Sequence, residues 1–286
     1  MIAVHRHPAT LSGQRHGRIL LEIGLCVLLL IGLLPFFILL LNSFKDMMGI
    51  AKNILGWPNP FKLSNYARAF EKLSYPRSFF NTLLVTLLGN AGLIIFGSMA
   101  GYRLNRAPTV FNKIVYLLLL ASMAIPFEAV MIPLMKVSSG VGLTKSLGGL
   151  GICYWGMGAS TCIFLTHGAV KGIPYDLEEA AIIDGCGPFK TFWRVIFPLL
   201  RTTVVTYTIL NTFWFWNDYL MPQLMLGGDK QIYTIQLSMR SLFLEYYAMW
   251  DVALAALVIS LLPTVIFFLI AQKYILSGLT AGAIKG

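Results

Sequence analysis

Charged side chains are scarce in this 286-residue chain, because Asp, Glu, Lys and Arg together make up only 12% of it. A soluble globular domain carries about 25%. Hydrophobic residues reach 57%, and the mean hydropathy is +0.73. So few polar residues could not cover the surface of a soluble fold. The composition therefore excludes an ordinary soluble domain and predicts an integral membrane protein, with membrane lipid as its surroundings.

The residue types that build catalytic and metal sites are equally few. There are four histidines, three of them in the first 16 residues, and four cysteines without CxxC spacing. We therefore predict no metal site, no disulfide and no clustered constellation of a membrane-embedded enzyme. A P-loop is missing too, because Thr144 stands where the motif ending at Lys145-Ser146 needs its second glycine. The chain is predicted not to be an enzyme and to bind no cofactor of its own.

The net charge of +10 does not indicate a nucleic-acid partner, because the basic residues are spread over short segments without interleaved aromatics. They are typical of the flanks of membrane spans. If the amino terminus is cytoplasmic, the inner segments hold 12 basic residues and the outer loops 10. This count favours both termini inside, but only weakly.

Six apolar stretches are long enough to cross a bilayer as helices, since about 20 residues span its hydrocarbon core. The first follows Arg15 and Arg18 and lacks a small-residue cleavage site, so it is predicted to be a retained anchor. The sequence thus predicts an all-α integral membrane fold with six transmembrane helices. The stretches are Ile19–Leu41, Phe79–Tyr102, Asn112–Met135, Leu147–Val170, Leu199–Leu220 and Val252–Lys273. Gly97 and Gly101 form a GxxxG pair in the second stretch, a pattern that permits close helix packing.

The segment Lys171–Pro198, between the fourth and fifth stretches, carries the densest run of charge in the chain. Asp176 is placed to cap a helix, with Glu179 in the capping-box position, and Gly185 stands where the helix should end. Pro188 can open a second short helix. We predict a helix–turn–helix outside the bilayer that fits a partner's groove. A helix lying on the lipid headgroups is the alternative.

At this point the sequence resembles a family. Glu179-Ala180-Ala181, three residues, Gly185, nine residues and then Val195-Ile196-Phe197-Pro198 is similar to the EAA loop of ABC-importer permeases. Val195 and Phe197 replace an Ile and a Leu of that pattern, and Thr202 stands where many relatives have a second Pro. Asn81-Thr82, the run Trp216-Asn217-Asp218 and the tail Gly278–Gly286 resemble the carbohydrate branch, most of all the smaller membrane subunit of maltose-type importers.

The resemblance implies a permease subunit that moves sugars or oligosaccharides into a bacterial or archaeal cell by alternating access. Its partners would be a second permease, two ATPases that use ATP and Mg²⁺, and an extracytoplasmic solute-binding protein. It also implies one permease domain, 1–286, in the cytoplasmic membrane. The lead 1–18, the coupling loop 171–198 and the tail 274–286 would be cytoplasmic.

The motif and the energetic cost of ionisable groups in a membrane suggest roles for individual residues. In the EAA loop, Glu179 and Asp184 would anchor basic groups of the ATPase, and Ala180 and Ala181 would allow close approach to its groove. Gly185 would permit the turn, and Pro198 would close the motif. Elsewhere, four residues at span ends are candidates for the transport path or a subunit contact: Glu128, Trp216, Asn217 and Asp218. Glu128 and Asp218 are candidates because ionisable groups in a membrane are costly. Trp216 and Asn217 are candidates because they belong to the run that resembles the carbohydrate branch.

Two questions stay open from the sequence. The same architecture would serve a peptide or polyamine importer, and a self-contained secondary transporter is a more distant alternative. The predicted outer loop 42–78 holds six basic and two acidic residues, a net charge of +4. One hypothesis is that it guides an acidic oligosaccharide or docks an acidic binding protein, and the other is that its lysines only solubilise it.

Overall fold

The computed structural model describes residues 11–245 and 249–283, and every element in these ranges is a helix. Contacts within the chain divide it into two compact units. The first unit comprises residues 1–69 and 249–258, and the second comprises residues 70–248 and 259–286. The predicted lead 1–18 is described only from residue 11 and the predicted tail 274–286 only to residue 283. The prediction of one permease domain stays a prediction.

In the first unit, the segment after helix α1 (Leu11–Ser43) is tied together by Lys45. Its ammonium group is buried and donates hydrogen bonds to Asn42 Oδ1, Asn53 O and Ile54 O over 2.9–3.0 Å. Arg68 in helix α3 (Ser64–Lys72) forms an ion pair with Asp251 at 3.0 Å. Two of the six basic residues of the predicted outer loop therefore hold the chain itself together.

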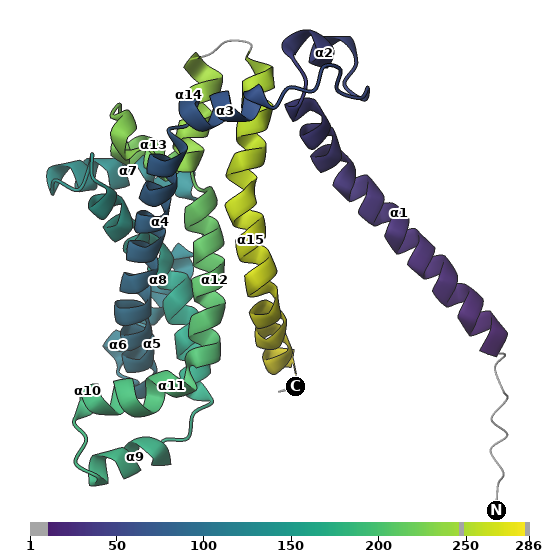
Figure 1. Cartoon of the computed structure of the whole chain (residues 1–286). Coiled ribbons are helices and arrows are strands. Elements are labelled where there is room, and N and C mark those ends of the chain that lie inside the picture. The colour runs from purple at the N-terminus through teal and green to yellow at the C-terminus, as the bar shows by residue number, and fades with distance from the viewer. Residues whose placement is uncertain (1–10, 246–248, 284–286) are drawn as a thin grey trace, which may run out of the picture. The chain divides into compact units, whose positions relative to one another are not determined.

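The second unit contains the long helices that position the site. Two helices joined by a π-helical turn form one rod from residue 75 to residue 106, which packs along α8 and α12 (Figure 1). Besides α1 and α3, the described helical elements are α2 (Met47–Lys52), α4 (Tyr75–Gly92), the π turn η1 (Leu93–Gly97), α5 (Ser98–Arg106), α6 (Val110–Ser122), α7 (Phe127–Gly140), α8 (Leu147–Lys171), α9 (Asp176–Ile183), α10 (Pro188–Thr191), the π turn η2 (Phe192–Ile196), α11 (Phe197–Leu199), α12 (Arg201–Asn217), α13 (Leu220–Leu226), the 3₁₀ turn η3 (Lys230–Ile232), α14 (Ile235–Glu245) and α15 (Trp250–Ala283).

Close packing of α4, η1 and α5 against α8 depends on glycine. A Cβ on Gly92 would lie 2.0 Å from the Trp155 ring, and one on Gly97 would lie 2.6 Å from Cys162 Sγ. A Cβ on Gly101 would meet Thr166 Cβ at 2.7 Å. The GxxxG pair predicted from the sequence is therefore a helix-packing face.

Four described helices are long and apolar enough to cross a membrane: Gly17–Ser43, Tyr75–Arg106, Leu147–Lys171 and Trp250–Tyr274. The fifth predicted stretch corresponds to α12, which has 17 residues. The third stretch, Asn112–Met135, was predicted as a single helix, and this is wrong. It divides into α6 and α7, and the chain bends by 114° between them.

The cause of this break is Pro126. Its own backbone is extended, with φ −67° and ψ 148°, and it caps the start of α7. A proline also disfavours the helical conformation at the residue before it. A second proline, Pro133, sits inside α7 without ending it.

Candidate functional site

The segment between α8 and α12 forms a helix, a turn and a second helix, as the sequence predicts. Helix α9 ends where Gly185 takes a positive φ of 79°. Gly185 N donates to Ile182 O, and Cys186 N donates to Ala181 O, both over 2.9 Å. This pair of bonds is a Schellman motif, which satisfies the last carbonyls of a helix and favours glycine. The predicted role of Gly185 in the turn is confirmed.

The predicted cap at Asp176 is wrong by one residue. Tyr175 precedes the helix, with φ −68° and ψ −28°, and makes no side-chain capping bond. Its carbonyl accepts instead from the amides of Glu178 and Glu179, over 2.8 and 3.2 Å. Because Tyr175 is already near-helical, the turn starts early and Asp176 becomes its first helical residue. Three acidic residues lie in the first turn, where the helix dipole favours negative charge.

The second arm begins at Pro188, as predicted, and continues through a π turn to α11. Phe192 and Ile196 point into the core and are 2% and 0% exposed. Both arms lie at one end of the rod made by α4 and α5, beside the ends of α8 and α12 (Figure 1). Pro198, the last residue of the motif, lies exposed in α11.

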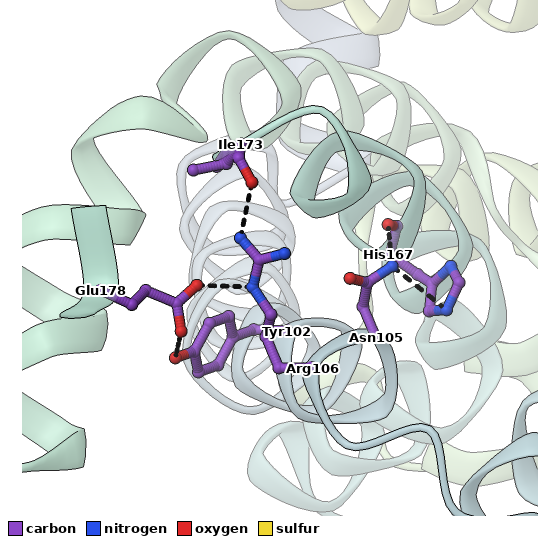
Figure 2. Close-up of polar contacts among 6 residues, drawn as sticks. All are labelled: Tyr102, Asn105, Arg106, His167, Ile173 and Glu178. Carbon is purple, nitrogen blue, oxygen red and sulfur yellow. Dashed lines mark hydrogen bonds and ion pairs between the residues drawn. The ribbon is translucent and has the colours of Figure 1, made fainter. Parts of the chain in front are cut away.

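One acidic residue ties α9 to the end of the long rod. Glu178 is 4% exposed, its Oε2 accepts from Tyr102 Oη over 2.7 Å, and its Oε1 pairs with Arg106 Nε (Figure 2). Arg106 Nη2 also donates to Ile173 O over 2.8 Å. The Arg106 guanidinium lies 5.6 Å from the centre of the Tyr175 ring. The guanidinium group of Arg106, which belongs to α5, therefore contacts both the α8–α9 connection and α9.

Sequence reasoning missed this cluster. The motif directs attention to Glu179, yet its neighbour Glu178 is the buried one. Arg106 lies 72 positions before Glu178 in the chain. The available signal was weak: Tyr102 and Arg106 are four residues apart at the end of a predicted span, so they share a helix face.

Several large apolar side chains of the segment face outward. Ile182, Ile183 and Phe189 are 58%, 86% and 68% exposed. Among the predicted anchors, Glu179, Ala180, Asp184 and Gly185 lie exposed, and Ala181 is buried against the chain itself. The segment therefore presents an apolar surface with carboxylates beside it, a face suited to a groove on a partner.

A second group of predicted residues meets elsewhere in the unit. Glu128 in the first turn of α7 lines a hollow of about 390 Å³ together with Asn217, the last residue of α12, and Asp218, which follows it. Trp216, the fourth predicted residue, is not part of this hollow. It is 9% exposed and its ring packs edge-on against Phe79, with centroids 5.4 Å apart. The structure thus brings three of the four candidates together.

Asp218 is held firmly by its surroundings. Its Oδ2 accepts from Tyr154 Oη over 2.8 Å, and its Oδ1 accepts from the amides of Leu220 and Met221 over 3.0 and 3.4 Å. Asn217 donates to Phe213 O over 2.8 Å. No described group of three His, Cys, Asp or Glu side chains could hold a metal ion.

Comparison with known proteins gives a consistent result. Residues 93–280 match the family described as "Binding-protein-dependent transport system inner membrane component". The chain is 40% identical to the probable starch degradation products transport system permease protein AmyC of Thermoanaerobacterium thermosulfurigenes, over 91% of this chain and 94% of that protein. It is 34% identical to the melibiose/raffinose/stachyose import permease protein MelC of Bacillus subtilis, over 88% and 91%.

A solved structure has the same fold. It is a chain of a bacterial ABC transporter involved in the import of the acidic polysaccharide alginate, with a TM-score of 0.76 and coverage of 94% of this chain and 99% of that chain. The two are 23% identical, so the likeness concerns the fold alone.

Proposed function

The chain belongs to the inner membrane components of binding-protein-dependent transport systems and is a permease subunit of an ATP-driven sugar importer, in which we propose that α9 is the lever moved by a separate ATPase. The observation that carries the proposal is the buried contact of Glu178 with Tyr102 and Arg106. A force on the outer face of α9 reaches α5 directly through this contact.

The energetics support a rigid lever. Removing one partner of a buried ion pair costs about 3–5 kcal/mol, because the other charge stays buried without compensation. Side-chain exposure is 15% for Arg106 and 6% for Glu178, so water does little to screen the pair. Helix α9 therefore cannot tilt alone at low cost. It carries α5 with it, and the glycine-mediated packing links α5 to α8.

We place the rest of the importer around this lever. Glu179, Ala180 and Asp184 contact an ATPase, which uses ATP and Mg²⁺, and Ala181 keeps α9 close to its own chain. Two such ATPases, a second permease and an extracytoplasmic solute-binding protein complete the assembly. With α12 and the bent pair α6–α7 counted as crossings, the subunit has six spans. Helix α9 and both termini then lie in the cytoplasm.

The lever is tested by reversing the exposed charge and by breaking the turn. Glu179→Lys should weaken co-purification of the ATPase and uncouple ATP hydrolysis from sugar uptake, and Gly185→Pro should do the same by distorting the end of α9. Glu71→Lys, the same exposed charge reversal in α3, is the matched control. Normal uptake with a normal ATPase rate in either α9 variant would rule out the lever.

Orientation has its own test, in a background without the native cysteines. Ser64→Cys should react with a membrane-impermeant thiol reagent added to intact cells. Cys186, restored alone, should react only after permeabilisation. The reverse pattern would invert the membrane orientation and place α9 outside, away from any ATPase.

A further inference from the structure

We propose that two hollows that share Trp214 as a lining residue form a saccharide site in this subunit, and that the site accepts an uncharged sugar ring and disfavours a uronate. The proposal rests on the importer function given above and adds the charge class of the sugar. One hollow is the 390 Å³ space beside Glu128 and Asp218. The other has about 520 Å³ and is lined by Ser122, Pro133, Met157 and Ser160, among others.

Trp214 lines both hollows, and 39% of its surface is exposed to them and to solvent. Ligand pockets generally hold about 300–1,000 Å³, so each hollow could admit a sugar unit. An exposed indole offers an apolar face with little rotamer freedom to lose on binding. A sugar ring has an apolar face of its own, so stacking against Trp214 is the expected contact.

One residue, Tyr154, holds both the Trp214 ring and the Asp218 carboxylate. Tyr154 in α8 is fully buried, and its ring meets that of Trp214 edge-on with centroids 6.0 Å apart. Its hydroxyl donates to Asp218 Oδ2. Tyr154 therefore fixes the stacking surface and one polar group at the same time, as a preorganised binding site requires.

Charge decides which sugar fits. Among the described residues that line the two hollows, Glu128 and Asp218 are the only charged ones. Glu128 lies exposed in the first turn of α7, so its oxygens can accept from sugar hydroxyls. Arg240 lies 5.2 Å from the centre of the Tyr219 ring and does not line either hollow. The described lining residues include no cation, so a uronate carboxylate placed here would face two like charges, which disfavours it.

The test uses the purified importer with all its subunits except the solute-binding protein, so that the permease alone supplies the sugar site. Binding of maltotriose and raffinose, which are neutral, and of trigalacturonate, which is acidic, is measured by equilibrium dialysis. The wild type should bind a neutral sugar more tightly. Trp214→Ala should weaken that binding about tenfold, and Trp214→Phe should restore most of it. Phe111→Ala, an exposed aromatic of α6 outside both hollows, should have no effect.

Glu128→Gln is the charge test, because it keeps an acceptor and removes the negative charge. It should tighten trigalacturonate binding relative to binding of the neutral sugars. Unchanged binding in Trp214→Ala, or tighter binding of trigalacturonate by the wild type, would overturn the proposal. Failure of the lever is distinguishable: Glu179→Lys should uncouple transport of every sugar and leave sugar binding in this assay intact.

Discussion

The two sites each contain a pair of carboxylates, and in each pair a buried or half-buried tyrosine holds one member and leaves the other open. At α9, Tyr102 holds Glu178 and the motif residue Glu179 faces outward. At the hollows, Tyr154 holds Asp218 and Glu128 lies open. The difference is the cation: Arg106 pairs with Glu178, and no described cation pairs with Asp218.

This difference separates a mechanical contact from a binding contact. The ion pair at α9 cancels its own charge and makes a stiff joint, since breaking it strands a buried charge. The neutral donors around Asp218 fix its position and leave its charge uncancelled. A joint needs the first arrangement, and a site that selects ligands by charge needs the second.

The largest effect should come from breaking the joint. Arg106→Met should lower the free energy of unfolding by about 3–5 kcal/mol, because Glu178 loses its partner while still buried. The double variant Arg106→Met, Glu178→Gln should recover much of this loss. Thermal unfolding of the purified complex measures both. If the single and double variants are equally unstable, the ion pair is not what joins α9 to α5.

A smaller effect is expected when the hollow loses its tyrosine hydroxyl. Tyr154→Phe removes one hydrogen bond to a charged acceptor, worth about 1.5–3 kcal/mol. The backbone amides of Leu220 and Met221 remain in place. The same unfolding assay applies, with Tyr102→Phe as its counterpart at α9. If Tyr154→Phe lowered the free energy of unfolding as much as Arg106→Met, the proposed difference between the two sites would be wrong.

The next largest effect is expected at the turn that ends α9. Gly185→Ala keeps the chain length and forces a side chain into a left-handed backbone conformation, at φ 79°. The expected cost is about 1–2 kcal/mol. Gly187→Ala, two residues on, is the control, because Gly187 has a φ of −73° that any residue adopts. Equal stability of the two variants would mean that the turn relaxes without cost.

The smallest effect is expected at the open carboxylates. Glu179→Gln and Glu128→Gln should change the free energy of unfolding by less than about 0.5 kcal/mol, since neither side chain is held by the fold. Their effects should appear only in ATPase coupling and in sugar binding, respectively. A clear loss of stability in either variant would show that this carboxylate is held as well.

Local features were predictable from the sequence and distant ones were not. The turn at Gly185, the helix start at Pro188 and the glycine face at Gly97 and Gly101 depend on residues a few positions apart. The joint of Arg106 with Glu178 needs two spans folded side by side, which no short pattern reveals. Pro126 was visible, but a proline inside a predicted span can either be tolerated, as Pro133 is, or break the helix.

The outer basic segment illustrates a second limit. A net charge of +4 over residues 42–78 suggested an external partner, but a charge count cannot tell a free lysine from a buried one. Lys45 donates to three oxygens of its own chain, and Arg68 pairs with Asp251. The net charge therefore overstates what this segment can offer an acidic ligand.

The π turn at Leu93–Gly97 determines where the rod of residues 75–106 can lose a residue. Gly92 and Gly97 are five residues apart, a spacing that puts them on different faces of an α-helix but close to one face when a turn closes at i to i+5. The extra residue therefore keeps the glycines before and after the turn aligned toward α8. Deleting one residue within 94–96 would turn this stretch into ordinary α-helix with the alignment preserved. A deletion anywhere else in the rod would rotate the part that follows it by about 100°. Larger side chains would then replace the glycines on the face that packs against α8.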